Sequence, residues 1–584
     1  MFNYNMSKTP NYDVKVKAIL DATKPGERVC ELTGEKWNMT EEEIGWYRKF
    51  NVPPSKYSPN TRWKILAYFS TGFQFWWNKH FETGESVLSF HHPATGIRVL
   101  PDQEWLERDF SNVSLLLSTD QSFFDQLYIL TRKVPYRATY DLVPPEQSIS
   151  LVSLGEQDCY FTLGSRGKRN FFSWVCMDGE NSSLVFLSNN VVDSHQILHC
   201  NRIFQCKYLR ECFDCMDSCF LFDCRSCQYC FGASNKRNRK YLWWNEQLSK
   251  EEWEKRRAEV NLGKRSVVEE CEQSFEKLLL EDTIWPENFN EKTTDSTGEY
   301  LNGSVNCSQC YSAVSGSLYN FRCTYSIGSC SHCAFCWGSK DTSESYFSVT
   351  IAGSNKCQFC FRCPQNDTCY YCLMCDNCQY CFGCVGLRRK KYYILNQPYT
   401  EENYWKEVDK IMCKMLEDNE HGDFFPTKFS STYGPESGAA VYCGSSVEEI
   451  RQLGPNNFDP NEQGATQRKE IDPKLIRLRT DIPDSIDELT DDWIGVPIYD
   501  EEAKRTFAFL KPEIEHYRSV HVAPPNTHFI RRTNKASVLG QLCSLEKRLC
   551  SNCAKESLVA KCENYPDRKI YCKSCYLNYL EEHG

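Results

Sequence analysis

Four cysteines near the C-terminal end of the sequence have the spacing of a metal site. Cys550 and Cys553 form one Cys-x-x-Cys pair, and Cys572 and Cys575 form a second pair after 18 intervening residues. Four thiolates brought together by a hairpin bind Zn²⁺ tetrahedrally and leave no open position for water. Packing without metal is the alternative, but so small a unit rarely has enough core of its own. We therefore predict a zinc ribbon with about one structural Zn²⁺ per chain.

A second group of cysteines recurs at multiples of three residues. It runs from Cys357 to Cys384, in CQFCFRCPQNDTCYYCLMCDNCQYCFGC. Strand side chains alternate with a period of two, and the aromatic content with Gly, Asn and Asp punctuation disfavours a helix. Stacked coils of about twelve residues suit this spacing, with small side chains inside each coil. The pattern predicts a narrow, cysteine-lined β-solenoid.

The cysteine-rich unit occurs twice. CQYCFGASNKRNRKYLWWNEQLSKEEW, from Cys227, aligns without a gap with CQYCFGCVGLRRKKYYILNQPYTEENY, from Cys378, at an offset of 151 residues. Each copy ends in a strand-like run followed by a helix, which would cap the stack. We therefore predict two tandem solenoids with strand–helix caps, at residues 151–300 and 301–420.

Two roles are open to the array cysteines. As ligands, CxxC-spaced thiols such as Cys357, Cys360, Cys378 and Cys381 could bind several soft metal ions. As packed groups they need no metal, because free cysteine is among the most buried residue types. Serine takes the cysteine position at Ser345, which favours packing, since the position then needs a small side chain before it needs a thiol.

The two ends of the chain also resemble each other. EEIGWYRKFNVPP near the N-terminus matches PEIEHYRSVHVAPP near the C-terminus. In the same alignment the four ribbon cysteines fall opposite His80, Thr83, Pro101 and Glu104. Because these four residues do not make a zinc shell, we predict a ribbon-like unit without its ligands at residues 1–112.

Charge is unevenly distributed along the chain. The 584 residues carry a formal net charge of −10, which argues against a surface coated by nucleic acid. An acidic connector is predicted at residues 421–502, because residues 414–502 hold 20 acidic and 8 basic side chains. The connection at residues 113–150 is predicted to be a helical linker.

The C-terminal unit is basic. Residues 503–584, the predicted zinc-ribbon unit, hold 14 basic and 8 acidic side chains. Arg531, Arg532 and Lys535 lie in one short basic stretch, and zinc ribbons often present such side chains to nucleic acid. These three residues are the candidate nucleic-acid contacts.

The remaining patterns bear on location and chemistry. The start of the sequence has no signal-peptide run, and no stretch approaches about 18 apolar residues, so a cytoplasmic protein without a membrane partner is expected. In that compartment the 35 cysteines are expected as thiols or metal ligands rather than disulfides. No GxxxxGK[ST], GxGxxG, HExxH or GxSxG motif occurs, so an enzyme is the less favoured class.

Several stretches carry a family resemblance: CELTGEKW, WYRKFNVPPSKYSP, NKHFETGE, the two CQYCFG arrays, HGDFFP and the closing ribbon. On these stretches the chain resembles a group of cysteine-rich, zinc-ribbon-like repeat proteins from uncultivated candidate-phyla bacteria. Such proteins usually carry cysteines where this chain has residues 57–60 and 101–104. The resemblance implies the architecture and metal binding, and it implies no activity.

The fold expected from these patterns is mainly β with helical caps, with two tandem cysteine-lined solenoids between ribbon-like units. Three functional hypotheses follow from it. The first is a non-enzymatic zinc-binding interaction protein whose basic C-terminal ribbon contacts nucleic acid or a nucleoprotein. The second is a structural scaffold that assembles with itself as a homo-oligomer or with other proteins. The third is a metal-storage or thiol redox protein.

Overall fold

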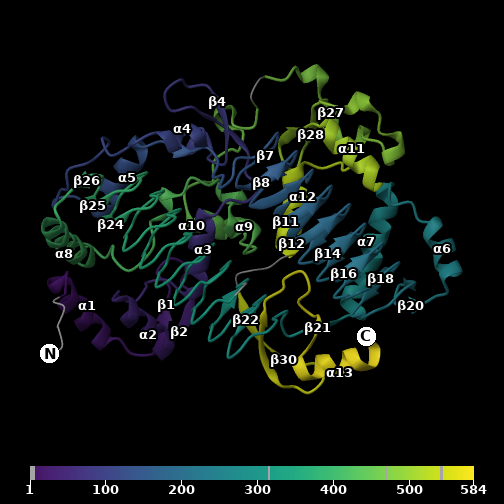
Figure 1. Ribbon diagram of the computed structural model, residues 1–584, viewed down its shortest axis with the longest axis horizontal. Helices are drawn as coiled ribbons and strands as arrows, with labels where there is room; N and C mark the ends of the chain where they lie inside the picture. The colour runs from purple at the N-terminus through teal and green to yellow at the C-terminus, as the bar shows by residue number, and fades with distance from the viewer. Residues whose placement is uncertain (1–6, 314–315, 468–469, 540–543) are drawn as a thin grey trace.

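A computed structural model describes residues 7–313, 316–467, 470–539 and 544–584. The protein is rich in sheet with some helices, and its largest sheet is a mixed sheet of 12 strands. Two stacks of short strands and turns fill the middle of the molecule, and helices and hairpins surround them (Figure 1). Among the described residues, no helix combines the length and the apolar character needed to cross a membrane.

The first stack, here called the first array, covers residues 149–247 and holds the large sheet. Successive coils pair in parallel at a separation of twelve residues, as Cys219 does with Phe231 and Phe231 with Trp243. The last pair of strands is antiparallel, which makes the sheet mixed. The strands of this region are β7 (Ile149–Ser150), β8 (Ser153–Gln157), β9 (Tyr160–Thr162), β10 (Ser165–Lys168), β11 (Trp174–Glu180), β12 (Ser183–Val192), β13 (His195–Leu198), β14 (Asn201–Phe204), β15 (Lys207–Arg210), β16 (Phe213–Met216), β17 (Cys219–Phe222), β18 (Phe231–Ser234), β19 (Leu242–Trp243) and β20 (Glu246–Gln247).

The second stack, the second array, covers residues 291–398. Much of its pairing consists of single parallel bridges. In the later coils these are twelve residues apart, such as Ser343 with Asn355, whereas the first coils have 11 or 13, such as Glu291 with Asn302 and Val305 with Leu318. The strands here are β22 (Gly298–Glu299), β23 (Cys310–Tyr311), β24 (Gln379–Phe382), β25 (Lys391–Ile394) and β26 (Gln397–Pro398).

Every third residue of a coil turns a corner. In the second array, Phe359, Arg362, Gln365 and Thr368 all have φ between 52° and 55°, in the left-handed region. Each three-residue side therefore has one inward residue, one bridging residue and one corner. This conformation disfavours L-residues by roughly 1–2 kcal/mol each, so the pairing and stacking between coils must offset it.

Helices follow both arrays. α6 (Lys250–Ala258) and α7 (Arg265–Glu281) follow the first array, and α8 (Glu401–Glu417) follows the second. Ser249 and Thr400 are the N-caps of α6 and α8, each accepting a hydrogen bond from a backbone N–H three residues later. The N-terminal helix α1 (Pro10–Ala22) packs against α8, and β21 (Ile284–Pro286) follows α7.

Outside the arrays, four hairpins of one type lie in two pairs. The N-terminal pair spans residues 26–107 and the C-terminal pair residues 498–583, related by an offset of 470 or 471 residues. The elements of the N-terminal pair are β1 (Gly26–Val29), β2 (Lys36–Met39), α2 (Glu41–Phe50), α3 (Pro59–Phe69), β3 (Trp76–Lys79), β4 (Ser86–Ser89), β5 (Val99–Leu100) and α4 (Asp102–Glu107). The elements of the C-terminal pair are β28 (Ile498–Asp500), β29 (Arg505–Phe507), α11 (Lys511–Val520), α12 (Phe529–Leu539), β30 (Leu545–Leu549), β31 (Glu556–Ala560), β32 (Lys569–Tyr571) and α13 (Lys573–His583).

The hairpin pairs dock crosswise on the arrays. Trp46 of the N-terminal pair stacks on Phe321 of the second array, with ring centroids 5.9 Å apart. The equivalent residue of the C-terminal pair, His516, stacks on Phe171 of the first array at 4.9 Å. Each end of the chain therefore covers the array that is more distant in the sequence.

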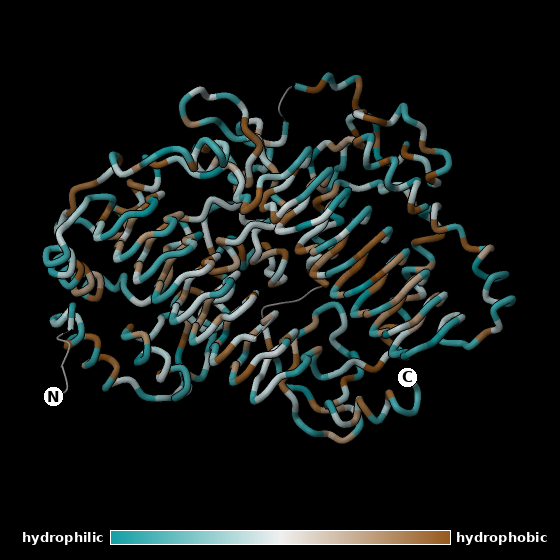
Figure 2. Tube along the Cα trace, in the orientation of Figure 1, coloured by the Kyte–Doolittle hydropathy of each residue, from teal (hydrophilic) through white to brown (hydrophobic). Residues whose placement is uncertain are grey.

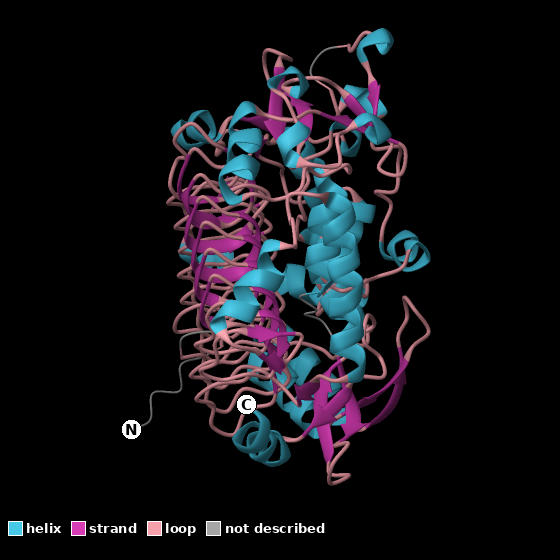
Figure 3. Cartoon of the chain, turned by 90° about the vertical axis from the view of Figure 1, so that its right-hand side faces the viewer, coloured by secondary structure: helices cyan, strands magenta, loops and turns pink. Residues whose placement is uncertain are grey.

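The two arrays lie side by side and run in opposite directions. Tyr300, early in the second array, stacks on His199 with ring centroids 3.9 Å apart, and Tyr325, two coils later, contacts the earlier residue Trp174 at 5.3 Å. Seen from the side, the strands form a column with helices along it (Figure 3). Hydrophobic positions recur along the coils, whereas many peripheral loops are hydrophilic (Figure 2).

The two connections are built from short elements. Residues 113–150 contain α5 (Phe123–Lys133) and β6 (Tyr136–Arg137). Residues 421–502 contain α9 (Gly438–Val441), α10 (Val447–Leu453) and β27 (Arg477–Leu478), together with short 3-10 helices. The acidic connection also supplies core residues, since Phe424 and Phe425 are buried in the main cluster.

Candidate metal centre

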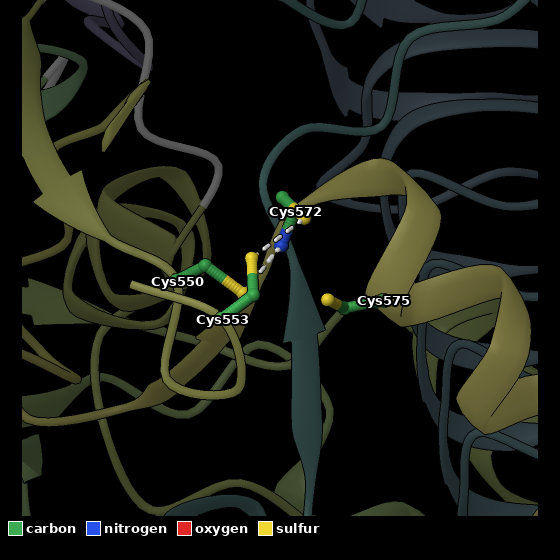
Figure 4. Close-up of side chains that lie close together, drawn as sticks. All are labelled: Cys550, Cys553, Cys572 and Cys575. Atoms are coloured by element: carbon green, nitrogen blue, oxygen red, sulfur yellow. Dashed lines mark hydrogen bonds between the residues drawn. The ribbon is translucent and has the colours of Figure 1, made fainter. Parts of the chain in front are cut away.

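The four cysteines predicted as ligands come together at one end of the C-terminal hairpin pair (Figure 4). Cys550 and Cys553 lie in the turn between β30 and β31. Cys572 is the N-cap of α13, and Cys575 lies in the first turn of that helix. The first turn is tight, because the Cys550 N–H bonds to the Lys555 carbonyl at 2.8 Å.

Their sulfur atoms have the spacing of a closed metal shell. All four Sγ atoms lie within 4.8 Å of one another, and those of Cys553 and Cys572 are 3.7 Å apart. A tetrahedral Zn²⁺ with Zn–S bonds of about 2.3 Å requires sulfur atoms about 3.8 Å apart. The sequence set therefore forms a group that could hold a metal ion, with Cys550 and Cys572 buried and Cys553 exposed.

Backbone N–H groups favour thiolates at this site. Burial raises the pKa of Cys550, but N–H groups that include those of Cys572 and Cys553 outweigh it and bring the pKa to about 6. The Cys572 N–H lies 3.3 Å from the Cys550 Sγ. The Ser574 hydroxyl is the largest influence that lowers the pKa of Cys572. Both changes favour the thiolate form of Cys550 and Cys572, which a cation binds, whereas hydrogen bonds from the neighbouring cysteines, first Cys575, raise the pKa of Cys553.

The site joins two pieces of the chain that are anchored differently. β30 pairs with β31, whereas β32 pairs in parallel with β21, which follows the first array. The Tyr576 hydroxyl of α13 donates to the buried carboxylate of Asp223 in that array. A metal bound by both cysteine pairs would therefore link the β30–β31 hairpin to elements fixed on the first array.

The equivalent hairpin near the N-terminus keeps the backbone and lacks the ligands. The His80 N–H bonds to the Glu85 carbonyl at 2.8 Å, as Cys550 does with Lys555. The Phe81 N–H bonds to Val99 at 2.8 Å, as Ser551 does with Ile570. At the ligand positions, His80 Nε2 lies 3.0 Å from Glu104 Oε2.

Two further hairpins repeat the same turn, and the sequence analysis missed them. In the first, Cys30, Thr33, Ser58 and Thr61 take the four ligand positions, and the Cys30 Sγ lies 3.3 Å from the Thr61 hydroxyl. The pKa of Cys30 is lowered because hydroxyl and backbone hydrogen bonds, led by that of Thr33, outweigh the effect of burial. The signal in the sequence is the shared pattern of CELTGE and HFETGE.

The second missed hairpin has Asp500, Ala503, His528 and Arg531 at the four positions. The Asp500 carboxylate accepts a hydrogen bond from the His528 N–H at 2.8 Å and pairs with Arg531 at 3.2 Å. A constant offset of 470 residues from the Cys30 hairpin could have located it. Polar contacts thus occupy the ligand positions in three of the four hairpins.

The array cysteines line the interiors of the coils. Cys357, Cys360, Cys378 and Cys381 are fully buried. Within the described ranges, the group near the C-terminus is the one set of three or more potential ligands whose donor atoms all lie within 4.8 Å of one another. The four array cysteines singled out from the sequence belong to no such group there.

Thiol hydrogens in the arrays meet backbone carbonyls instead. The Cys360 Sγ lies 3.5 Å from the Gln358 carbonyl and 3.4 Å from the Cys369 carbonyl. At an equivalent position one coil earlier, the Ser348 hydroxyl donates to Tyr346 at 2.9 Å. Serine and cysteine are therefore equivalent at these positions, because each provides a small side chain with one hydrogen-bond donor. This accounts for their exchange between coils.

The candidate nucleic-acid residues all lie on α12 and all face acidic partners. Arg531 pairs with Asp500 and Glu502, and Lys535 pairs with Glu272 at 3.2 Å. Arg532 is largely buried, donating to the Tyr517 hydroxyl at 2.9 Å and lying over the ring of Phe172. Their charges are engaged within the chain.

Comparison with known proteins adds no assignment. A scan against protein-family models finds no match for this chain, and a search of curated proteins finds none either. The residues of the site therefore carry the functional argument by themselves.

Proposed function

We propose that this protein is a non-enzymatic interaction scaffold, built on two β-solenoids and stabilised by one structural Zn²⁺ in a C-terminal zinc ribbon. The twelve-residue offsets and inward cysteines support the solenoid assignment. The paired Cys-x-x-Cys turns support the ribbon assignment.

The metal assignment depends on one observation: the Sγ atoms of Cys550, Cys553, Cys572 and Cys575 lie within 4.8 Å of one another. Four thiolates are soft ligands, and a tetrahedral set of this kind is typical of structural zinc. The shell is complete without water, so the ion supplies binding energy and supports no hydrolysis.

The arrangement of the arrays favours a scaffold over a metal store. Array thiols bond to carbonyls, as Cys360 does, and equivalent positions accept serine or threonine. Two side-by-side columns, each covered by the opposite end of the chain, form an extended support with much exposed loop surface. Direct nucleic-acid contact through Arg531 and Arg532 is not part of this proposal, because both side chains have partners within the chain.

Elemental analysis of the anaerobically purified protein tests the metal assignment. About one zinc per chain is expected in the wild type and almost none in a Cys550→Ser/Cys553→Ser variant. The matched control, Cys357→Ser/Cys360→Ser, should retain its zinc. Several metal ions per chain that persist in the ribbon variant would contradict the scaffold and favour metal storage.

A further inference from the structure

A cavity of about 490 Å³ lies between the first array, α6 and α11. The array contributes Lys207, Asp217 and Tyr229 to its wall, and α6 contributes Trp253 and Arg257. The volume is within the range of small-molecule sites, and the walls combine aromatic rings with charged groups.

Two cations line this cavity and form no ion pair with a described residue, although the carboxylates of Asp193 and Asp217 lie on the same wall. The Lys207 ammonium forms no ion pair or side-chain hydrogen bond with any residue that the structure describes. Arg257 donates to the Val260 carbonyl at 2.7 Å and forms no ion pair within the described part of the chain. Burial lowers the pKa of Lys207, and the positive charge of Arg257 lowers it further. An anion bound between the two groups would offset both the burial of the Lys207 charge and its repulsion by Arg257.

The neighbouring cavity provides a contrast. It measures about 390 Å³ and lies between the first array, α7 and α12. Its cations are paired: Arg210 with Glu276 at 2.8 Å, and Lys535 with Glu272 at 3.2 Å. The cations of that cavity thus have ion-pair partners, whereas Lys207 and Arg257 have none among the described residues.

The second half of the molecule has no cation at the two corresponding positions. By the offset of 151 residues, Lys207 and Arg257 correspond to Gln358 and Val408. Gln358 donates to the Phe50 carbonyl at 3.2 Å, and Val408 is fully buried. α1 packs on α8 there, with Tyr12 buried. The second half thus has neutral side chains at the two positions where the first half places cations in the cavity wall.

Aromatic and acidic groups complete the wall. The rings of Tyr229 and Trp253 meet edge to face, with centroids 6.0 Å apart. Such rings offer a surface for a planar group. Asp217 lies on the same wall and offers a carboxylate to a hydrogen-bond donor.

We propose that this cavity binds a small anion joined to a planar, hydrogen-bonding ring, of which a nucleoside monophosphate is the simplest representative. Lys207 and Arg257 receive the anionic group, Tyr229 and Trp253 contact the ring, and Asp217 accepts from its N–H or hydroxyl groups. This site is independent of the zinc assignment.

Isothermal titration of the full-length protein with AMP, adenosine and inorganic phosphate tests the proposal. AMP is expected to bind, and each of the Lys207→Gln and Arg257→Gln variants should bind it about tenfold or more weakly, because each removes one charged contact. Lys207→Gln copies the residue that the second half already uses at this position, so folding should be preserved. Lys255→Gln, on an exposed position of the same helix, is the matched control and should bind AMP as the wild type does.

The three ligands separate the parts of the site. Adenosine should bind much more weakly than AMP, and phosphate should bind weakly with the same dependence on Lys207. If phosphate binds as tightly as AMP, the ring contacts are absent and the proposal fails in that part. If AMP shows no binding at millimolar concentration, or if Lys255→Gln weakens it as much as Lys207→Gln does, the site is overturned.

Discussion

His80 Nε2 lies 3.0 Å from Glu104 Oε2, within hydrogen-bond distance, at positions equivalent to those of Cys550 and Cys575. The turn that surrounds them has the same backbone hydrogen bonds as the turn of the candidate metal centre. A direct contact between side chains has thus taken the place of a shared ligand shell. The same substitution by polar contacts occurs at Cys30 and at Asp500, so one hairpin geometry is stabilised in several chemical ways.

Three substitutions should create a zinc site in the N-terminal hairpin pair. Cys30 already occupies a ligand position, and Thr33, Ser58 and Thr61 occupy the other three. A Thr33→Cys/Ser58→Cys/Thr61→Cys variant should bind about one more zinc per chain than the wild type, because the backbone already places the four side chains around one point. Elemental analysis measures the gain.

The control for this variant keeps three of the four ligands. Adding Cys30→Ser should remove most of the gained zinc affinity without changing the metal content of the C-terminal cysteine group. An unchanged zinc content in the triple variant would mean that the two hairpins share a turn but not the spacing of their side chains.

Comparison of the four hairpins shows which features of the fold and of the candidate site could be predicted from the sequence. The paired CxxC motif identified the four cysteines that the structure brings together, because ligand spacing is local. The three-residue period likewise indicated coils, and the parallel pairing at twelve residues agrees with it. The hairpins of Cys30 and Asp500 were missed because neither contains a CxxC pair, so that only comparison with the related hairpins locates them.

Crosswise docking of the hairpin pairs could not be predicted from the sequence. It depends on contacts such as Trp46 on Phe321, between residues 275 positions apart. Nothing local distinguishes an aromatic residue that will cover a distant array from one in an ordinary core. The same limit applied to Arg532, whose basic neighbourhood suggested an exposed contact although Glu513 and Tyr517 receive its charge within the fold.

Zinc removal should loosen one hairpin and leave the arrays folded. β32 is held by β21 and α13 by Asp223, whereas the β30–β31 hairpin would lose its link to them. On chelation, amide exchange in residues 545–560 should rise strongly while exchange in β15 to β18 stays unchanged. Hydrogen exchange read by mass spectrometry measures both regions in one experiment.

The Cys550→Ser/Cys553→Ser variant serves as the control for chelation. Its exchange in the hairpin should be high from the start and should not respond to the chelator. Loss of protection throughout the arrays would instead indicate that metal ions also hold the coils of the arrays together.

The interior of the second array should accept exchange of cysteine for serine and reject larger groups. Cys360 is fully buried and bonds to carbonyls as Ser348 does. Cys360→Ser should therefore cost about 1 kcal/mol or less, whereas Cys360→Leu should cost roughly 1–3 kcal/mol or more, because a narrow coil cannot take extra methylene groups. Denaturant unfolding compares the two variants.

The reverse exchange is the matched control for the array. Ser348→Cys should leave the free energy of unfolding nearly unchanged, since neighbouring coils carry cysteine in the same column. A severe loss of stability in Cys360→Ser, together with loss of bound metal, would show that this thiol is a ligand.

A buried carboxyl group in the first array should make stability depend on pH. Glu156 is 2 % exposed, and burial raises its pKa to about 7. The unfolded chain has the ordinary value of about 4.3, so folding is unaffected by this group below that pH. As the pH rises through the interval from about 4.3 to 7, the folded state resists ionisation and stability falls, by roughly 3–4 kcal/mol at the upper end.

Glu156→Gln should abolish this component. Its stability relative to the wild type should be near zero at pH 4 and rise to a gain of roughly 3 kcal/mol by pH 8, because glutamine resembles the neutral acid and cannot ionise. Denaturant unfolding at several pH values measures the difference, and Glu146→Gln, at an exposed position, should show no such trend. A gain that is already present at pH 4 would instead assign the effect to packing, since both forms of residue 156 are neutral there.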